Sequence, residues 1–143
     1  MITKKLEGID MIYRARARVM LMEPFFSFLV MKLGIEIDER VGTAAVDGKK
    51  ITYSMNFFSS LSVDEQVFVV LHETLHVLLK HHLRRGKRKP NLWNMACDYI
   101  INAKAKKFGY KLPSIVLFSK RFDGMCEEQV YDILEQEAEG AGG

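Results

Sequence analysis

The apolar residues of this chain are densest in one segment near its middle. Residues 67–71 (Val-Phe-Val-Val-Leu) and 77–79 (Val-Leu-Leu) are apolar, which predicts a helix buried on nearly every side. Just upstream, Ser62 and Glu65 have the spacing of a capping box, in which the two side chains bind free backbone N–H groups at a helix start. The pattern therefore predicts a core helix that begins after Ser62.

Before this helix, the pattern predicts two helices and a hairpin. The first helix ends at a break at Glu23-Pro24, and a short second helix ends near Gly34. Residues 43–46 and 49–53 flank Asp47-Gly48, a dipeptide suited to a tight turn, so they predict two antiparallel strands. Such a hairpin either covers the core or offers an edge to an extended peptide.

After the core helix, the pattern predicts more helix. A helix is expected from Pro90-Asn91, with Asn91 as its N-cap, to a stop near Gly109. Residues 111–117 predict an extended or loop-like segment, and residues 126–137 predict an amphipathic helix led by Val130, Ile133 and Leu134. The fold class predicted is α+β, mostly helical, with a small antiparallel sheet before the core helix.

Length and composition predict one domain. The chain has 143 residues, of which 48% are hydrophobic, enough for a single core over residues 1–139, and residues 140–143 (Gly-Ala-Gly-Gly) predict a disordered tail. Residues 1–8 lack the apolar core of a signal peptide, and the apolar stretch 19–33 is interrupted by charges and proline, so we expect a cytoplasmic protein without a membrane span. Cys97 and Cys126 suit a reducing compartment.

The candidate chemistry lies inside the core helix, where His72, Glu73 and His76 form an H-E-x-x-H motif. Residues four apart on a helix share a face, so the two imidazoles can bind one metal ion, with the Glu73 carboxylate beside it. Each polar group buried without a partner would cost about 2–7 kcal/mol. A metal site removes that cost; the alternative is a pair of histidines hydrogen-bonded in the core.

The third metal ligand is predicted from the next helix. Asn94, Asp98 and Asn102 recur every four residues as one polar stripe, opposite the lysines at 104, 106 and 107. Because the lysines mark the solvent face, Asp98 is expected to point inward, where a carboxylate needs a cation or several donors. Asp98 is therefore the candidate third ligand, and Asn94 and Asn102 are candidates to orient the ligands. The alternative is an Asp98 that is hydrogen-bonded only for packing.

His81 and His82 are the other candidates for the third ligand. His82 has the spacing from His72 that metzincin peptidases use, but the glycine turn which that arrangement needs is replaced by Leu79. If the helix continues, His81 points about 180° from His72 and His82 about 80° from it. Neither then reaches the same ion, and both are expected to be exposed histidines at a helix end.

Residues 72–76 together with residues 92–102 (Leu-Trp-Asn-Met-Ala-Cys-Asp-Tyr-Ile-Ile-Asn) resemble a family of predicted zinc metallopeptidases. Members of that family are often fused ahead of a von Willebrand A-like domain in bacteria and phages. The resemblance covers most of the chain and implies a zincin-like fold, His72, His76 and Asp98 as Zn²⁺ ligands, and Glu73 as the catalytic residue. It also implies a peptide or protein substrate. No von Willebrand A-like portion is seen in this sequence, so the alternatives are a partner that supplies it in trans and a domain that acts alone.

The sequence favours a zinc-dependent peptidase in which Glu73 takes a proton from a metal-activated water. The donor that stabilises the oxyanion is left open among Tyr99, Tyr110, Tyr131, His81 and Arg121.

The alternative function is a catalytically silent, metal-stabilised module that binds nucleic acid or protein. Its basis is a basic patch at Lys80, Arg84, Arg85, Lys87, Arg88 and Lys89, in a chain of net charge +3. The simpler interpretation of that patch is solubility and a favourable interaction with helix C-termini. No array of stacking aromatic residues accompanies it.

Overall fold

The computed structural model of the protein describes residues 7–141. Its helices are α1 (Ile9–Met22), α2 (Ser27–Lys32), α3 (Met55–Ser60), α4 (Val63–Leu78), α5 (His81–Arg84), α6 (Pro90–Lys107) and α7 (Glu127–Ala141). Its strands are β1 (Gly34–Ile37), β2 (Ala44–Val46) and β3 (Lys50–Tyr53), and short 3-10 turns lie at Pro24–Phe26, Glu39–Val41 and Lys120–Phe122. Segment 1–6, where no signal peptide is expected, lies outside the described residues.

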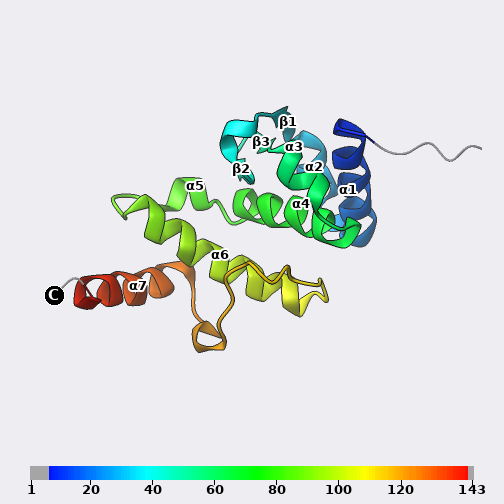
Figure 1. The fold of residues 1–143 in the computed structure, drawn as a ribbon. Helices are drawn as coiled ribbons and strands as arrows, with labels where there is room; N and C mark the ends of the chain where they lie inside the picture. The colour runs from blue at the N-terminus through cyan, green and yellow to red at the C-terminus, as the bar shows by residue number, and fades with distance from the viewer. Residues whose placement is uncertain (1–6, 142–143) are drawn as a thin grey trace, which may run out of the picture.

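Helix α4 is the centre of the fold, as the apolar pattern predicts. It lies between the small sheet and α6 (Figure 1), and α1 packs along it at the end far from α7. Val70 and Leu71 are fully buried in it. The predicted capping box is present, because Ser62 accepts a hydrogen bond from the Glu65 N–H while the Glu65 carboxylate accepts one from the Ser62 N–H. Such a cap typically stabilises a helix by about 1 kcal/mol.

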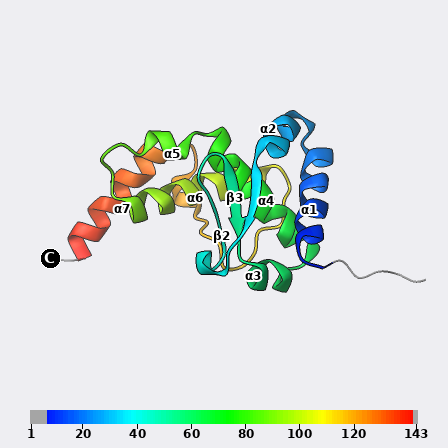
Figure 2. The same cartoon turned by 90° about the horizontal axis from the view of Figure 1, so that it is seen from above.

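The sheet has the order β1-β3-β2 and lies over α4 (Figure 2). The predicted hairpin is confirmed: β2 and β3 pair antiparallel, with Ala45 opposite Thr52. The sheet as a whole is mixed, however, because β1 pairs parallel with β3. The expectation of a purely antiparallel sheet is therefore wrong, since the four-residue strand β1 is too short to be seen as a pattern. Strands β1 and β2 form the two edges.

Helix α6 divides its packing between two hydrophobic clusters. Ile101 and Ala105 in its C-terminal half belong to the main core around α4. Trp93 and Ala96 in its N-terminal half belong to a second cluster with α7, where Val130 is fully buried. The face that α6 turns to α4 thus lies where the two clusters meet.

The ends of α6 and α7 differ in part from the prediction. Helix α6 starts at Pro90 with Lys89 as its N-cap residue, not Asn91, because proline suits the first helical position. Its predicted end at Gly109, where φ is +92°, is confirmed. Helix α7 continues through Gly140 and Ala141, so the expectation of disorder from residue 140 is wrong for these two residues. Residues 142 and 143 of that tail lie outside the described part of the chain.

The overall class is α+β: mostly helical, with one small mixed sheet. Among the helices of residues 7–141, none combines the length and the apolar character needed to cross a bilayer.

Candidate metal centre

His72 and His76 project from one face of α4, as their spacing of four residues predicts. Their ring centroids lie 4.8 Å apart, and the two Nε2 atoms are separated by 3.2 Å. Both side chains are mostly buried, with exposed fractions of 13% and 16%. The motif therefore presents two imidazole nitrogens to one point.

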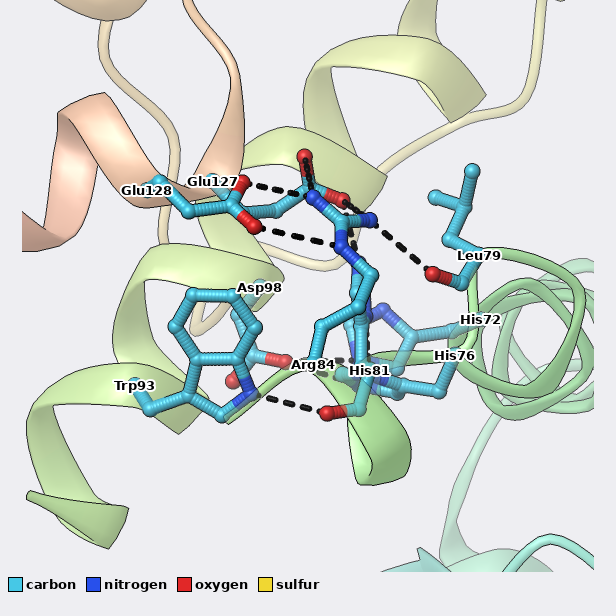
Figure 3. Close-up of polar contacts among 9 residues, drawn as sticks. All are labelled: His72, His76, Leu79, His81, Arg84, Trp93, Asp98, Glu127 and Glu128. Carbon is cyan, nitrogen blue, oxygen red and sulfur yellow. Dashed lines mark hydrogen bonds and ion pairs between the residues drawn. The ribbon is translucent and has the colours of Figure 1, made fainter. Parts of the chain in front are cut away.

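Asp98 of α6 reaches the same point (Figure 3). Its Oδ1 atom lies 3.0 Å from His72 Nε2 and 3.1 Å from His76 Nε2. Among the histidine, cysteine and acidic side chains of the described residues, these three form the group that lies closely enough together to hold a metal ion. Asp98 thus points toward α4, as the lysines on the opposite side of α6 predict.

Asn102 fixes the orientation of His72. Its Nδ2 donates to the Leu117 carbonyl at 2.7 Å, so its Oδ1 must face His72 Nδ1, which lies 3.0 Å away. An amide oxygen accepts, so the Nδ1 atom carries the proton. In the neutral ring, Nε2 then has a lone pair directed at Asp98. The contact with His72 Nδ1 is the one that the predicted orienting role of Asn102 requires.

Asn94 does not take the same role. It is exposed at the start of the polar stripe, and no hydrogen bond between its side chain and Asp98 or the two histidines is found among residues 7–141. It lines the cavity in front of the site instead.

His81 lies behind His76, and not at an exposed helix end. Helix α4 ends at Leu78, and Lys80 adopts a left-handed conformation with φ of +57°. This turn brings His81 Nδ1 to 2.9 Å from His76 Nδ1, and His81 is only 4% exposed. The expectation of exposure is therefore wrong for His81, because it assumed a continuous helix, whereas His82 is exposed as expected. His81 contacts the nitrogen of His76 that faces away from Asp98.

Glu73 lies in the wall of a cavity of about 610 Å³ that also contains His72, His76 and Asp98. It is 7% exposed, and within residues 7–141 no side-chain hydrogen bond holds its carboxylate. Residues 43–46, which include strand β2, and the irregular segment 115–117 also line the cavity. A carboxylate without a protein partner, beside a solvent-accessible cavity, is free to bind water.

The electrostatics of the site show how strongly Asp98 attracts positive charge. Burial alone would raise the pKa of Asp98, but its hydrogen bonds with the two imidazoles hold it below its ordinary value. Burial opposes charging of His72 as well, yet the bond to Asp98 raises its pKa. For His76 burial prevails and the pKa falls to about 4, while burial raises the pKa of Glu73 to about 7. Asp98 is thus ionised and needs a proton or a metal ion beside it.

Most of the candidate oxyanion donors lie away from the cavity. The Tyr110 hydroxyl donates to Glu23, the Tyr131 hydroxyl to Glu135, and Arg121 pairs with Glu137. Tyr99 stacks edge-on against Phe122. His81 lines the cavity, but both of its ring nitrogens have partners in the fold. Other side-chain donors that line the cavity include Thr43, His82, Arg85 and Asn94. Arg85 was visible in the sequence only as one member of the basic patch, because the turn that places it at the cavity has no sequence signal.

The three candidate ligands fit a metal ion. An ion with four tetrahedral ligands at about 2.0–2.1 Å separates those ligands by roughly 3.3–3.4 Å, close to the 3.0, 3.1 and 3.2 Å found between the three donor atoms. The set of two imidazoles and one carboxylate also suits Zn²⁺. When His72 is neutral and carries its proton on Nδ1, its Nε2 lone pair faces Asp98 Oδ1, and a positive ion at this point would remove the repulsion between the two atoms.

Comparison with protein families matches the chain to the family described as "putative metallopeptidase domain", over residues 10–143. Comparison with curated proteins and with solved structures gives no match. The match spans almost the entire chain, including the H-E-x-x-H helix and the helix that carries Asp98. This protein therefore belongs to the putative metallopeptidase domain family.

Proposed function

We propose that this domain is a zinc-dependent peptidase of zincin-like fold, in which His72, His76 and Asp98 hold the metal and Glu73 is the general base. The observation that carries the proposal is the convergence of three donor atoms within 3.2 Å of one another beside a buried carboxylate that faces a cavity. Structural zinc sites are closed by four protein ligands, whereas catalytic ones keep an open position. Three protein ligands beside a cavity favour catalysis.

Each residue of the site then has one task. Asp98 and the two imidazoles hold the metal, and Asn102 keeps His72 in the orientation that presents its Nε2 lone pair. Zinc would polarise the peptide carbonyl and acidify the attacking water. Glu73 accepts the proton of that water and returns it to the leaving amine. Because Glu73 is buried, its carboxylate has little competing solvation and a basicity suited to neutral pH.

Strand β2 supplies a place for an extended substrate. Along the hairpin, the Asp47 N–H donates to the Lys50 carbonyl and the Ser54 N–H donates to the Thr43 carbonyl. Because facing pairs alternate in an antiparallel ladder, Ala44 and Val46 direct their N–H and C=O groups away from β3, toward the open edge. Both residues line the cavity. A peptide added there would form backbone hydrogen bonds whatever its side chains.

One experiment tests both that the substrate is a peptide and that it binds along strand β2. Purified protein with one equivalent of Zn²⁺ is incubated with a mixture of unstructured peptides, and products are identified by mass spectrometry. We expect cleavage that stops on addition of a chelator. Replacing Ala44 by proline removes one outward N–H but no bond to β3. It should raise KM and lower kcat/KM by up to about 10-fold, the value of one hydrogen bond of 0.5–1.5 kcal/mol.

The matched control is Ala44→Gly, which keeps the N–H and should retain the KM of the wild type. If Ala44→Pro cleaves peptides with an unchanged KM while its metal content equals that of the wild type, substrate binding at β2 is rejected. No cleavage of any peptide by the zinc-loaded wild type would reject the peptidase itself.

The basic patch gives less support to the alternative of a nucleic-acid or protein-binding module. Arg84 is engaged by Glu127 and Glu128, and the Arg88 guanidinium stacks over Trp93 and Tyr131. Two of its six cations thus have partners within the fold. We therefore retain the peptidase as the proposed function.

A further inference from the structure

We propose that His81 and Glu127 are positioning residues for His76, so that helix α7 takes part in the metal site although none of its residues would touch the ion. The proposal rests on the metal centre proposed above. Its basis is an uninterrupted chain of contacts from α7 to His76: the Glu127 carboxylate binds His81 Nε2, and His81 Nδ1 lies 2.9 Å from His76 Nδ1.

The residues of this chain of contacts are buried. His81 is 4% exposed and Glu127 is 5% exposed, although both side chains are polar. Burial opposes ionisation of Glu127, but hydrogen bonds from His81 and Arg84 hold its pKa at about 2, so it is a carboxylate. Buried polar side chains are costly unless they are paired, and here each polar atom of the imidazole has a partner.

The positions of the protons follow from the partners. A carboxylate only accepts, so the proton of neutral His81 lies on Nε2, facing Glu127. His81 Nδ1 is then an acceptor, and His76 Nδ1 must donate to it. His76 therefore carries its proton on Nδ1 and presents a lone pair at Nε2, the atom 3.1 Å from Asp98 Oδ1. The pair His81-Glu127 thus selects the tautomer of His76 that can bind a metal.

The chain of contacts from Glu127 through His81 to His76 is held in place from two sides. Arg84 donates through Nη1 to Glu127 Oε2 at 3.0 Å and through Nη2 to Glu127 Oε1 at 3.1 Å (Figure 3). The Trp93 indole N–H donates to the His81 carbonyl at 3.0 Å. These contacts fix the carboxylate and the backbone on either side of the imidazole. His72 and His76 are thus oriented from different elements, His72 by Asn102 of α6 and His76 by α5 and α7.

Helix α7 offers a matched pair of variants. Glu127 and Glu128 are neighbours and both accept hydrogen bonds from Arg84, but only Glu127 binds His81. The Zn²⁺ dissociation constant is measured by competition with a chromophoric chelator, and the absorption spectrum of the Co²⁺-loaded protein reports ligand geometry. Glu127→Ala should bind Zn²⁺ about 10–100-fold more weakly, the usual loss when the partner of a ligating histidine is removed. Glu128→Ala should bind it as the wild type does.

His81 gives a second comparison within the full chain. His81→Leu removes the acceptor for His76 Nδ1 and should weaken Zn²⁺ binding and change the Co²⁺ spectrum. His81→Gln supplies an amide oxygen that can accept the same proton, so it should restore part of the affinity. A loss in His81→Leu with recovery in His81→Gln supports positioning through the hydrogen bond, since a packing role would not follow the acceptor.

Leu134→Ala is the control that distinguishes loss of the hydrogen bond between His81 and Glu127 from a general loosening of α7. Leu134 is buried in the second cluster and its apolar side chain offers His81 no hydrogen bond, so its truncation weakens the packing of α7 without removing a polar partner of His81. If Leu134→Ala lowers Zn²⁺ affinity as much as Glu127→Ala does, positioning by Glu127 is overturned. Unchanged Zn²⁺ affinity in both Glu127→Ala and His81→Leu would overturn the positioning of His76 by these residues while leaving the peptidase proposal intact. Failure of the wild type to bind any metal would overturn both.

Discussion

Replacement of Glu73 by glutamine should leave the metal in place and slow peptide hydrolysis by at least about 100-fold, the scale of a lost general base. The amide is close in size to the carboxylate, so the packing around residue 73 is conserved. It cannot accept a proton at neutral pH, and the attacking water then loses its base. Because Glu73 is not among the three converging donors, zinc content should stay equal to that of the wild type.

The measurement is kcat/KM on a peptide that the wild type cleaves, with zinc content determined on the same samples. Glu137→Gln, the same change on the surface of α7, is the control and should cleave at the rate of the wild type. Retention of most of the activity by Glu73→Gln, at equal zinc content, would remove Glu73 from the mechanism.

Zinc should stabilise the fold, because its proposed ligands come from two elements. His72 and His76 belong to α4, whereas Asp98 belongs to α6, where the two hydrophobic clusters meet. A ligand that binds only the folded state raises the free energy of unfolding by about 2.7 kcal/mol at a free concentration 100 times its Kd. Urea unfolding with and without Zn²⁺ measures this increment. In Asp98→Ala the increment should vanish.

Asp132→Ala, which removes an exposed carboxylate from α7, is the control and should keep the full increment. If Zn²⁺ stabilises Asp98→Ala as strongly as the wild type, then Asp98 is not a ligand. Stabilisation of neither protein by Zn²⁺ would mean that α4 and α6 are not joined by a metal at all.

The parts of the site that could be predicted are those fixed by helical periodicity. The facing of His72 and His76 depends only on their spacing along a helix that the apolar pattern and the capping box define. The inward placement of Asp98 follows from the lysines on the opposite side of α6. Family resemblance gave the same three residues, and the chain does belong to the putative metallopeptidase domain family.

What could not be predicted depends on turns and on distant pairings. The position of His81 depends on one residue, Lys80, whose left-handed conformation is rare outside glycine and has no sequence signal here. Its partner Glu127 lies 46 residues further along the chain. Strand β1 was missed because four residues carry too little pattern, and its parallel pairing with β3 depends on tertiary structure. Contacts of this kind are decided by packing rather than by local propensity.

We propose that His72, His76 and Asp98 together hold one zinc ion. The most direct test is elemental mass spectrometry of the purified protein, wild type beside Asp98→Ala, after both have been supplied with zinc and freed of excess. We expect about one zinc per wild-type chain and a sharply reduced content in the variant. A wild-type protein without zinc, or a variant that retains as much zinc as the wild type, would contradict this proposal.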